Sequence, residues 1–135
     1  MTVRLRMIYK DVVRELAFDR RSISIGQGPF NDIVCADAKI AGVHGDLEVH
    51  EDGDLAFRAR ASSLPTQVFR DGARTQSSDG VEEQTLHVRP GDVIGLGEAS
   101  SVKLEILGLE RRQHAVWSAH PVARDERAGR SEEGG

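Results

Sequence analysis

The chain has 135 residues, enough for one domain with its own hydrophobic core followed by a short tail. Its 18 Lys and Arg residues and 22 Asp and Glu residues give a formal net charge of −4, so we expect no nucleic-acid partner. The single cysteine, Cys35, excludes an internal disulfide and a cysteine-only zinc site, and it fits a reducing compartment such as the cytoplasm. Arg4 and Arg6 interrupt the apolar residues near the N-terminus, so we expect neither a secretory signal nor insertion into a membrane there.

Short apolar segments separated by turns fill the first half of the chain. Apolar and basic side chains alternate near the N-terminus, which is the period of a strand with one buried face. Two runs with β-branched residues flank a loop containing Gly28 and Pro29 and are too short for helices. Alternation resumes on both sides of a Glu-Asp-Gly-Asp turn, which predicts a β-hairpin. Strands are accordingly expected at residues 3–9, 12–18, 23–25, 33–35, 46–50 and 55–60.

The second half of the chain continues in the same way. A loop containing Pro65 precedes a short strand at residues 68–69, and a polar stretch at residues 75–83 is expected to be a mobile loop. No apolar period of 3.6 residues extends over three turns before Leu109, so we expect an all-β domain, either a sandwich or a barrel. The closing strands are expected at residues 85–89, 93–96 and 102–107.

The composition changes at Glu110, where Arg, Glu, Gly and Ser begin to dominate. This part has too little apolar content to offset the entropy lost on ordering. We therefore expect a domain over residues 1–109 and a polar, largely disordered tail over residues 110–135. Trp117 is either a docking point of the tail on the domain or an incidental aromatic residue in a linker.

Four segments follow one another in a characteristic order. They are Ile25-Gly26 followed by Asn31-Asp32-Ile33-Val34, then His44 at the start of a strand, then the loop and strand at residues 62–72, and finally Leu86-x-x-x-Pro-Gly-Asp-x-Ile-x-Leu-Gly97. In this order and spacing they resemble the forkhead-associated (FHA) domain over roughly residues 3–107. The resemblance implies a sandwich of two twisted, mainly antiparallel β-sheets, whose loops at one end bind a peptide containing phosphothreonine. It also implies that Gly26, Asn31, Asp32 and His44 are structural residues of that loop end.

Two of the segments depart from the FHA pattern at positions that contact phosphate. FHA domains usually have Arg directly after the Ile-Gly pair, where this chain has Gln27. Their Ser-Arg-x-His stretch corresponds to residues 41–44, in which Ala41 and Gly42 replace the hydroxyl and the arginine while His44 remains. The resemblance therefore extends to the fold and not to these phosphate contacts.

A third departure lies in the loop before the strand at residues 68–69. The Ser-x-Asn-Gly-Thr loop of FHA domains corresponds to residues 62–66, which keep Ser62 and Thr66 but have Leu64 and Pro65 in place of the asparagine and glycine. A charge-assisted hydrogen bond contributes roughly 1.5–3 kcal/mol. Loss of the Arg and Ser contacts together would weaken phosphopeptide binding by about two to four powers of ten.

Three functional hypotheses follow. The first is a non-catalytic module that binds another protein or peptide segment without depending on phosphate. The second is a phosphothreonine reader whose anion site is rebuilt from backbone N–H groups and from Lys39 and Arg70, which are expected on loops at the same end of the sandwich. The third is an enzyme, which no nucleophile–base pair or metal-ligand spacing in the sequence supports. We expect no metal and no cofactor.

Overall fold

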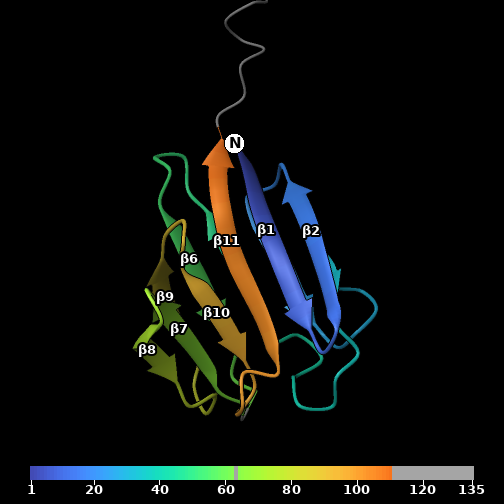
Figure 1. Ribbon diagram of the computed structural model, residues 1–135. Coiled ribbons are helices and arrows are strands. Elements are labelled where there is room, and N and C mark those ends of the chain that lie inside the picture. Colours follow the sequence, from blue (N-terminus) through green and yellow to red (C-terminus); the bar gives the residue numbers. More distant parts are fainter. Residues whose placement is uncertain (63, 111–135) are drawn as a thin grey trace, which may run out of the picture.

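The computed structural model describes residues 1–62 and 64–110. This part of the chain forms two β-sheets packed face to face and contains no helix (Figure 1). The prediction of an all-β sandwich is thereby confirmed. The strands are β1 (Thr2–Tyr9), β2 (Val12–Phe18), β3 (Ser22–Gly26), β4 (Ile33–Val34), β5 (Gly45–Val49), β6 (Leu55–Ala59), β7 (Thr66–Arg70), β8 (Ala73–Ser78), β9 (Gln84–Val88), β10 (Val93–Leu96) and β11 (Val102–Glu110).

The six-stranded sheet has the order β2-β1-β11-β10-β7-β8, and the five-stranded sheet has the order β4-β3-β5-β6-β9. The recorded neighbouring pairs are antiparallel except for β3 and β4, which run parallel. β11 ends at Glu110, one residue beyond the expected domain boundary. The expected tail from residue 111 onward, including Trp117, lies outside the described residues. No helix able to cross a membrane occurs in residues 1–62 and 64–110.

The core follows from the alternation of side chains along the strands. In β1 the inward-facing residues Val3, Leu5 and Met7 are buried, whereas Arg4 is exposed. Phe57 of β6 is fully buried in the same cluster. Each side chain of this size stabilises the fold by roughly 1.5–3 kcal/mol when it leaves water, so the inner faces of the two sheets hold the sandwich together.

The structure differs from the sequence expectation at residues 75–83. Residues Ala73–Ser78 form strand β8, which pairs antiparallel with β7. β8 lies at the edge of its sheet and most of its residues are exposed, so it carries no buried apolar face that the sequence pattern could reveal. The prediction of a mobile loop starting at residue 75 was therefore wrong, because backbone hydrogen bonds to β7 order this polar segment.

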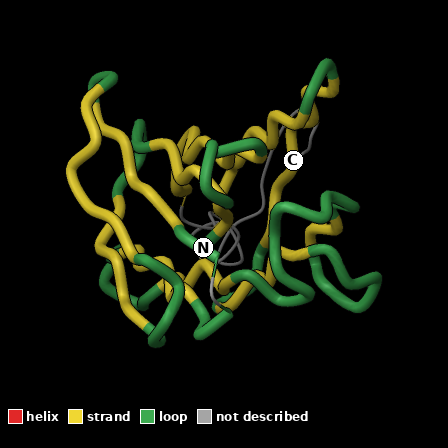
Figure 2. The backbone as a smooth tube through the Cα atoms, turned by 90° about the horizontal axis from the view of Figure 1, so that it is seen from below, coloured by secondary structure: helices red, strands yellow, loops and turns green. Residues whose placement is uncertain are grey.

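The loops that the FHA resemblance implicates gather at one end of the sandwich, the lower end in Figure 1. They are the β3–β4, β4–β5 and β6–β7 connections, joined there by the β8–β9 and β10–β11 connections. Figure 2 views the molecule from this side, with the loops in green. We call these five connections the loop end.

Candidate functional site

Backbone hydrogen bonds hold the β3–β4 and β4–β5 loops against each other. The N–H of Gln27 donates to the carbonyl of Ala41 at 2.9 Å, and the N–H of Gly28 donates to the carbonyl of Gly42 at 3.0 Å. The amide nitrogen of buried Asn31 donates to the carbonyl oxygens of Gly28 and Gly42, both at 2.7 Å. Asn31 thus ties the two loops together from within.

The base of the β3–β4 loop is fixed by a glycine and a carboxylate. A Cβ atom at Gly26 would lie 2.3 Å from the carbonyl oxygen of Gly42, so only glycine fits between the two loops. The Asp32 carboxylate accepts a hydrogen bond from the backbone N–H of Ser24 at 2.9 Å and forms an ion pair with Arg20. Both residues therefore position the loop that carries Gln27.

His44 joins the β4–β5 loop to the start of β7. Its ring is fully buried, and Nδ1 accepts a hydrogen bond from the N–H of Ala41 at 3.3 Å. The proton consequently lies on Nε2, which is 3.1 Å from the carbonyl of Pro65 and 3.0 Å from Oγ1 of Thr66. Burial lowers the pKa of His44, and the hydrogen bond to Pro65 opposes this only in part. His44 is therefore a neutral bridge between loops and is not exposed to a ligand.

The β6–β7 loop packs against the β8–β9 loop. The backbone N–H of Ser62 donates to the carbonyl of Gly80 at 2.9 Å, and a Cβ atom at Gly80 would lie 2.1 Å from the carbonyl oxygen of Leu64. The hydroxyl oxygen of Ser62 is buried and has no hydrogen-bond partner in the described part of the chain. Ser62 thus does not present its hydroxyl to an incoming phosphate.

The structure brings the equivalents of the phosphate-contacting residues together, but their side chains offer little to an anion. Gln27 is exposed and uncharged, and it lies beside half-buried Ala41. Gly42 is exposed and has open space where a side chain would lie. Gln27, Ala41 and Gly42 therefore supply neither a cation nor a hydroxyl at the junction of the two loops.

The two substitute cations lie at different ends of the sandwich. Lys39 is exposed in the β4–β5 loop. Arg70 ends β7, four residues beyond Thr66 and therefore about 13 Å from the loop end. Its Nε and Nη2 donate to the two carboxylate oxygens of Asp92 at 2.9 and 2.8 Å, and this interaction holds the pKa of Asp92 below its usual value. The expectation that Lys39 and Arg70 share one end was wrong, because β7 is five residues long and Arg70 is its last residue, away from the loop end.

Arg60, which the sequence reasoning did not single out, is a second cation at the loop end. Its N–H donates to the carbonyl of His44 at 3.0 Å, and its Nε donates to the buried carboxylate of Asp46 at 2.8 Å. The hairpin register offered a signal, since it pairs Asp46 with Arg58 and so places Arg60 on the same face of the sheet. Because the guanidinium of Arg60 is already hydrogen-bonded to the buried Asp46 carboxylate, it is not free to bind a phosphate.

Acidic residues outnumber basic residues at the loop end. In the described part of the five loops there are six acids and two bases. The formal charge of these loops is therefore negative, even though Arg20 pairs with Asp32, and it does not favour an anionic ligand. The acids are Asp32, Asp37, Asp79, Glu82, Glu83 and Glu98, and the bases are Lys39 and Arg60.

Two further features bear on possible chemistry. No group of three His, Cys, Asp or Glu side chains within residues 1–62 and 64–110 lies close enough to hold a metal ion. Cys35 is buried, and burial followed by the nearby charge of Asp37 raises the pKa of its thiol, so the nucleophilic thiolate is disfavoured.

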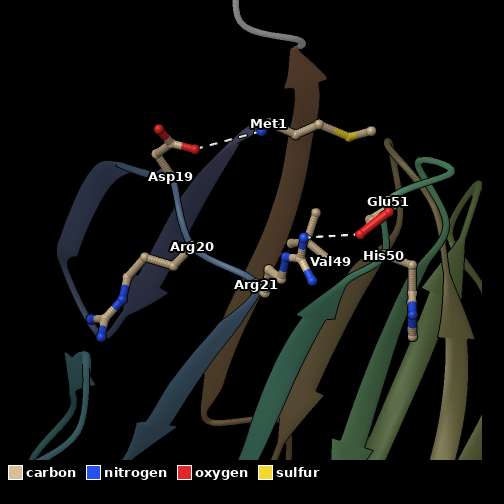
Figure 3. Close-up of a pocket in the computed structure, with 7 residues that line it drawn as sticks. All are labelled: Met1, Asp19, Arg20, Arg21, Val49, His50 and Glu51. Atoms are coloured by element: carbon tan, nitrogen blue, oxygen red, sulfur yellow. Dashed lines mark hydrogen bonds and ion pairs between the residues drawn. The ribbon is translucent and has the colours of Figure 1, made fainter.

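A pocket lies at the end of the sandwich opposite the loop end, between the N-terminus and the β2–β3 and β5–β6 turns (Figure 3). Arg21 in this pocket pairs with Glu51 at 3.0 Å. The guanidinium of Arg20 points away from Arg21 (Figure 3) and forms an ion pair with Asp32, just before β4. The two arginines therefore do not form a common anion site.

The sequence and the fold were compared with those of known proteins. No protein-family model matches the sequence, and no curated protein matches it. Solved structures do match: the FHA domain of the CT664 protein from Chlamydia trachomatis has a TM-score of 0.61 and 16% identity, covering 82% of this chain and 100% of that chain. An FHA domain from a study of phosphothreonine-dependent FHA interactions has a TM-score of 0.60 and 18% identity, covering 82% of this chain and 100% of that chain. The FhaA FHA domain, solved in complex with the intracellular domain of Rv3910, has a TM-score of 0.57 and 19% identity, covering 77% and 98%.

These matches concern the fold: the chain has an FHA-like β-sandwich architecture. The predicted resemblance in fold is confirmed. With identities of 16–19%, the likeness concerns the fold, so the chemistry of this loop end has to be argued from its own residues.

Proposed function

We propose that this domain is a non-catalytic protein-interaction module that binds another protein or peptide segment, and that its recognition of phosphothreonine is lost or strongly weakened. The observation that carries the proposal is the pairing of Gln27 with Ala41 and of Gly28 with Gly42, which builds the loop junction without a cation or a hydroxyl. Structural neighbours with phosphothreonine-dependent interactions or a bound protein segment support the general role in protein binding. The unpaired thiol of Cys35 supports a reducing compartment such as the cytoplasm.

The local charge supports the loss of phosphate recognition. A phosphothreonine carries about −1.5 to −2 charges and gains most of its binding energy from paired cations. Here Lys39 is the one loop-end cation without a carboxylate hydrogen bond in the described residues, and Asp37 lies two positions away. The loop end is thus suited to a partner that brings no phosphate.

The test is a titration of the whole chain with a degenerate phosphothreonine peptide pool and with the same pool after dephosphorylation. We expect no preference for the phosphorylated pool. Phosphate-dependent binding at micromolar concentration would overturn the proposal and favour a reader with a rebuilt anion site.

A gain-of-function variant sharpens this test. Gln27→Arg, Ala41→Ser and Gly42→Arg together restore the missing cations and hydroxyl, and neither Gln27 nor Gly42 is buried. If only side chains have been lost, binding of the phosphorylated pool should rise by about two to four powers of ten. The control adds two arginines elsewhere, at exposed Ser77 and Thr85, and should leave binding unchanged.

A further inference from the structure

The free edge of strand β2 is the second surface of interest. β2 ends the six-stranded sheet and pairs with β1 alone. Its backbone N–H and C=O groups that face away from β1 make no hydrogen bond with the rest of the described chain. Seven residues of strand are therefore open to pairing with another strand.

On the opposite side of the sandwich, one side chain bridges the end strands of the two sheets. There the side-chain amide of Gln76 in β8 donates to the carbonyl of His87 in β9 at 2.6 Å and accepts from its N–H at 3.2 Å. This amide satisfies the edge of β9 as a neighbouring strand would. β8 is itself an edge strand, but its exposed side chains are mainly polar, so it offers a partner strand little apolar contact.

Three of the five exposed large apolar residues in the described part of the chain lie on the end strands β2 and β4. Val12 and Val13 of β2 are 48% and 59% exposed, and Val34 of the end strand β4 is also exposed. Because β8 and β9 lie together at one side, the end strands β2 and β4 lie at the other, where the hydroxyl of Tyr9 reaches the carbonyl of Ala36. β2 thus offers apolar side chains on both of its faces beside an unpaired backbone.

The charged side chains of β2 indicate which residues a partner strand would carry. Glu15 is held by Arg6 at 3.1 Å. Arg14 is exposed and makes no ion pair or side-chain hydrogen bond within residues 1–62 and 64–110. An acidic residue opposite Arg14 would complement the one free charge of the strand. Antiparallel pairing of two copies of β2 centred on Arg14 would place Arg14 opposite its own copy, and pairing centred on Glu15 would do the same for Glu15, so a second copy fits less well in these two registers.

We propose that β2 is a docking edge for an extended segment of a partner protein, which adds a strand to the six-stranded sheet and carries an acidic residue opposite Arg14 and β-branched residues opposite Val12 and Val13. This surface is separate from the Gln27 junction, so it holds whether or not the loop end binds phosphate.

The test uses two synthetic peptides of equal composition and the whole chain. The first has the core Ile-Lys-Glu-Ile-Val, which in antiparallel pairing places Glu opposite Arg14 and Lys opposite Glu15. The second has the core Ile-Glu-Lys-Ile-Val, which places like charges at both positions. We expect backbone amide shifts in β2 on titration, with the first peptide bound about tenfold more tightly.

Variants assign the effect to the edge. Arg14→Glu should abolish or reverse the preference between the peptides, and Val13→Lys should weaken the first peptide at least fivefold. The matched control Ser77→Lys, on edge strand β8, should change neither.

Three results would overturn the proposal. They are equal binding of both peptides, shifts that occur in β8 or the loop end in place of β2, and β2 shifts that depend on protein concentration without peptide, which would assign the edge to a second copy. The phosphopeptide titration reports on the Gln27 junction, so failure of one proposal leaves the other distinguishable.

Discussion

Replacement of His44 by alanine should destabilise the domain severely, because this ring joins two loops from a fully buried position. The substitution removes hydrogen bonds to the N–H of Ala41 and to the Oγ1 of Thr66. Neither group has another hydrogen-bond partner in the described part of the chain, and a buried unpaired group such as the Thr66 hydroxyl costs about 1–3 kcal/mol. With the cavity left by the ring, we expect a loss of about 3–5 kcal/mol.

The measurement is urea unfolding of the wild type and His44→Ala at pH 7.5, with exposed His50→Ala as the matched control that should change stability by less than about 0.5 kcal/mol. A loss below about 1 kcal/mol for His44→Ala would refute the bridging role.

The pH dependence supplies a second readout of the same residue. Burial lowers the pKa of His44 in the folded state, so the unfolded chain takes up the proton first. The full contribution of His44 to the free energy of unfolding is present above about pH 6.5, the pKa of an unfolded histidine. This contribution decreases as the pH falls from there toward the lowered pKa of the folded state. His44→Ala should lack this part of the slope, whereas His50→Ala should retain it.

Three further predictions concern other parts of the fold. Asp92→Asn should lower the free energy of unfolding by about 1–3 kcal/mol at pH 7. Because the pKa of Asp92 is lowered in the folded state, the stability difference between wild type and variant should persist above about pH 4 and vanish as the pH falls through that folded pKa. A stability difference that does not change with pH in urea unfolding would contradict this. Gly26→Ala should cost about 2 kcal/mol or more in urea unfolding through its clash with the Gly42 carbonyl, whereas Gly42→Ala, with open space around it, should be nearly neutral. Gln76→Ala should cost about 1 kcal/mol and accelerate hydrogen exchange of the His87 amide, and unchanged exchange would show that β9 needs no such cap.

The strands that alternate apolar and polar residues could be predicted from the sequence, because burial of one face imposes that period. β1 and the β5–β6 hairpin are examples, with boundaries close to those expected. β8 could not be predicted in this way, because it is an edge strand held by backbone hydrogen bonds and its polar side chains carry no period.

The site could be predicted in part. The FHA resemblance implied that Gln27, Ala41 and Gly42 belong to one loop end, and backbone hydrogen bonds join Gln27 to Ala41 and Gly28 to Gly42. The position of Arg70 could not be judged, because the two-residue strand predicted before it did not show that the chain crosses the sheet between Thr66 and Arg70. The burial of the Ser62 hydroxyl likewise depends on the packing of Gly80 against Leu64, a tertiary contact without a local sequence signal.

The central position of β11 has a consequence for how the chain folds. The β1–β2 hairpin joins the rest of its sheet only through β11, so that Leu5 pairs with Ile106 across about a hundred residues of sequence. β1 can therefore pair with the rest of its sheet only after β11 is in place. Such non-local pairing raises the contact order and predicts folding on the millisecond to second timescale. Until β11 pairs with β1, the β1–β2 hairpin has two unpaired edges. Pairing of these edges with other chains is therefore most probable during this stage of folding.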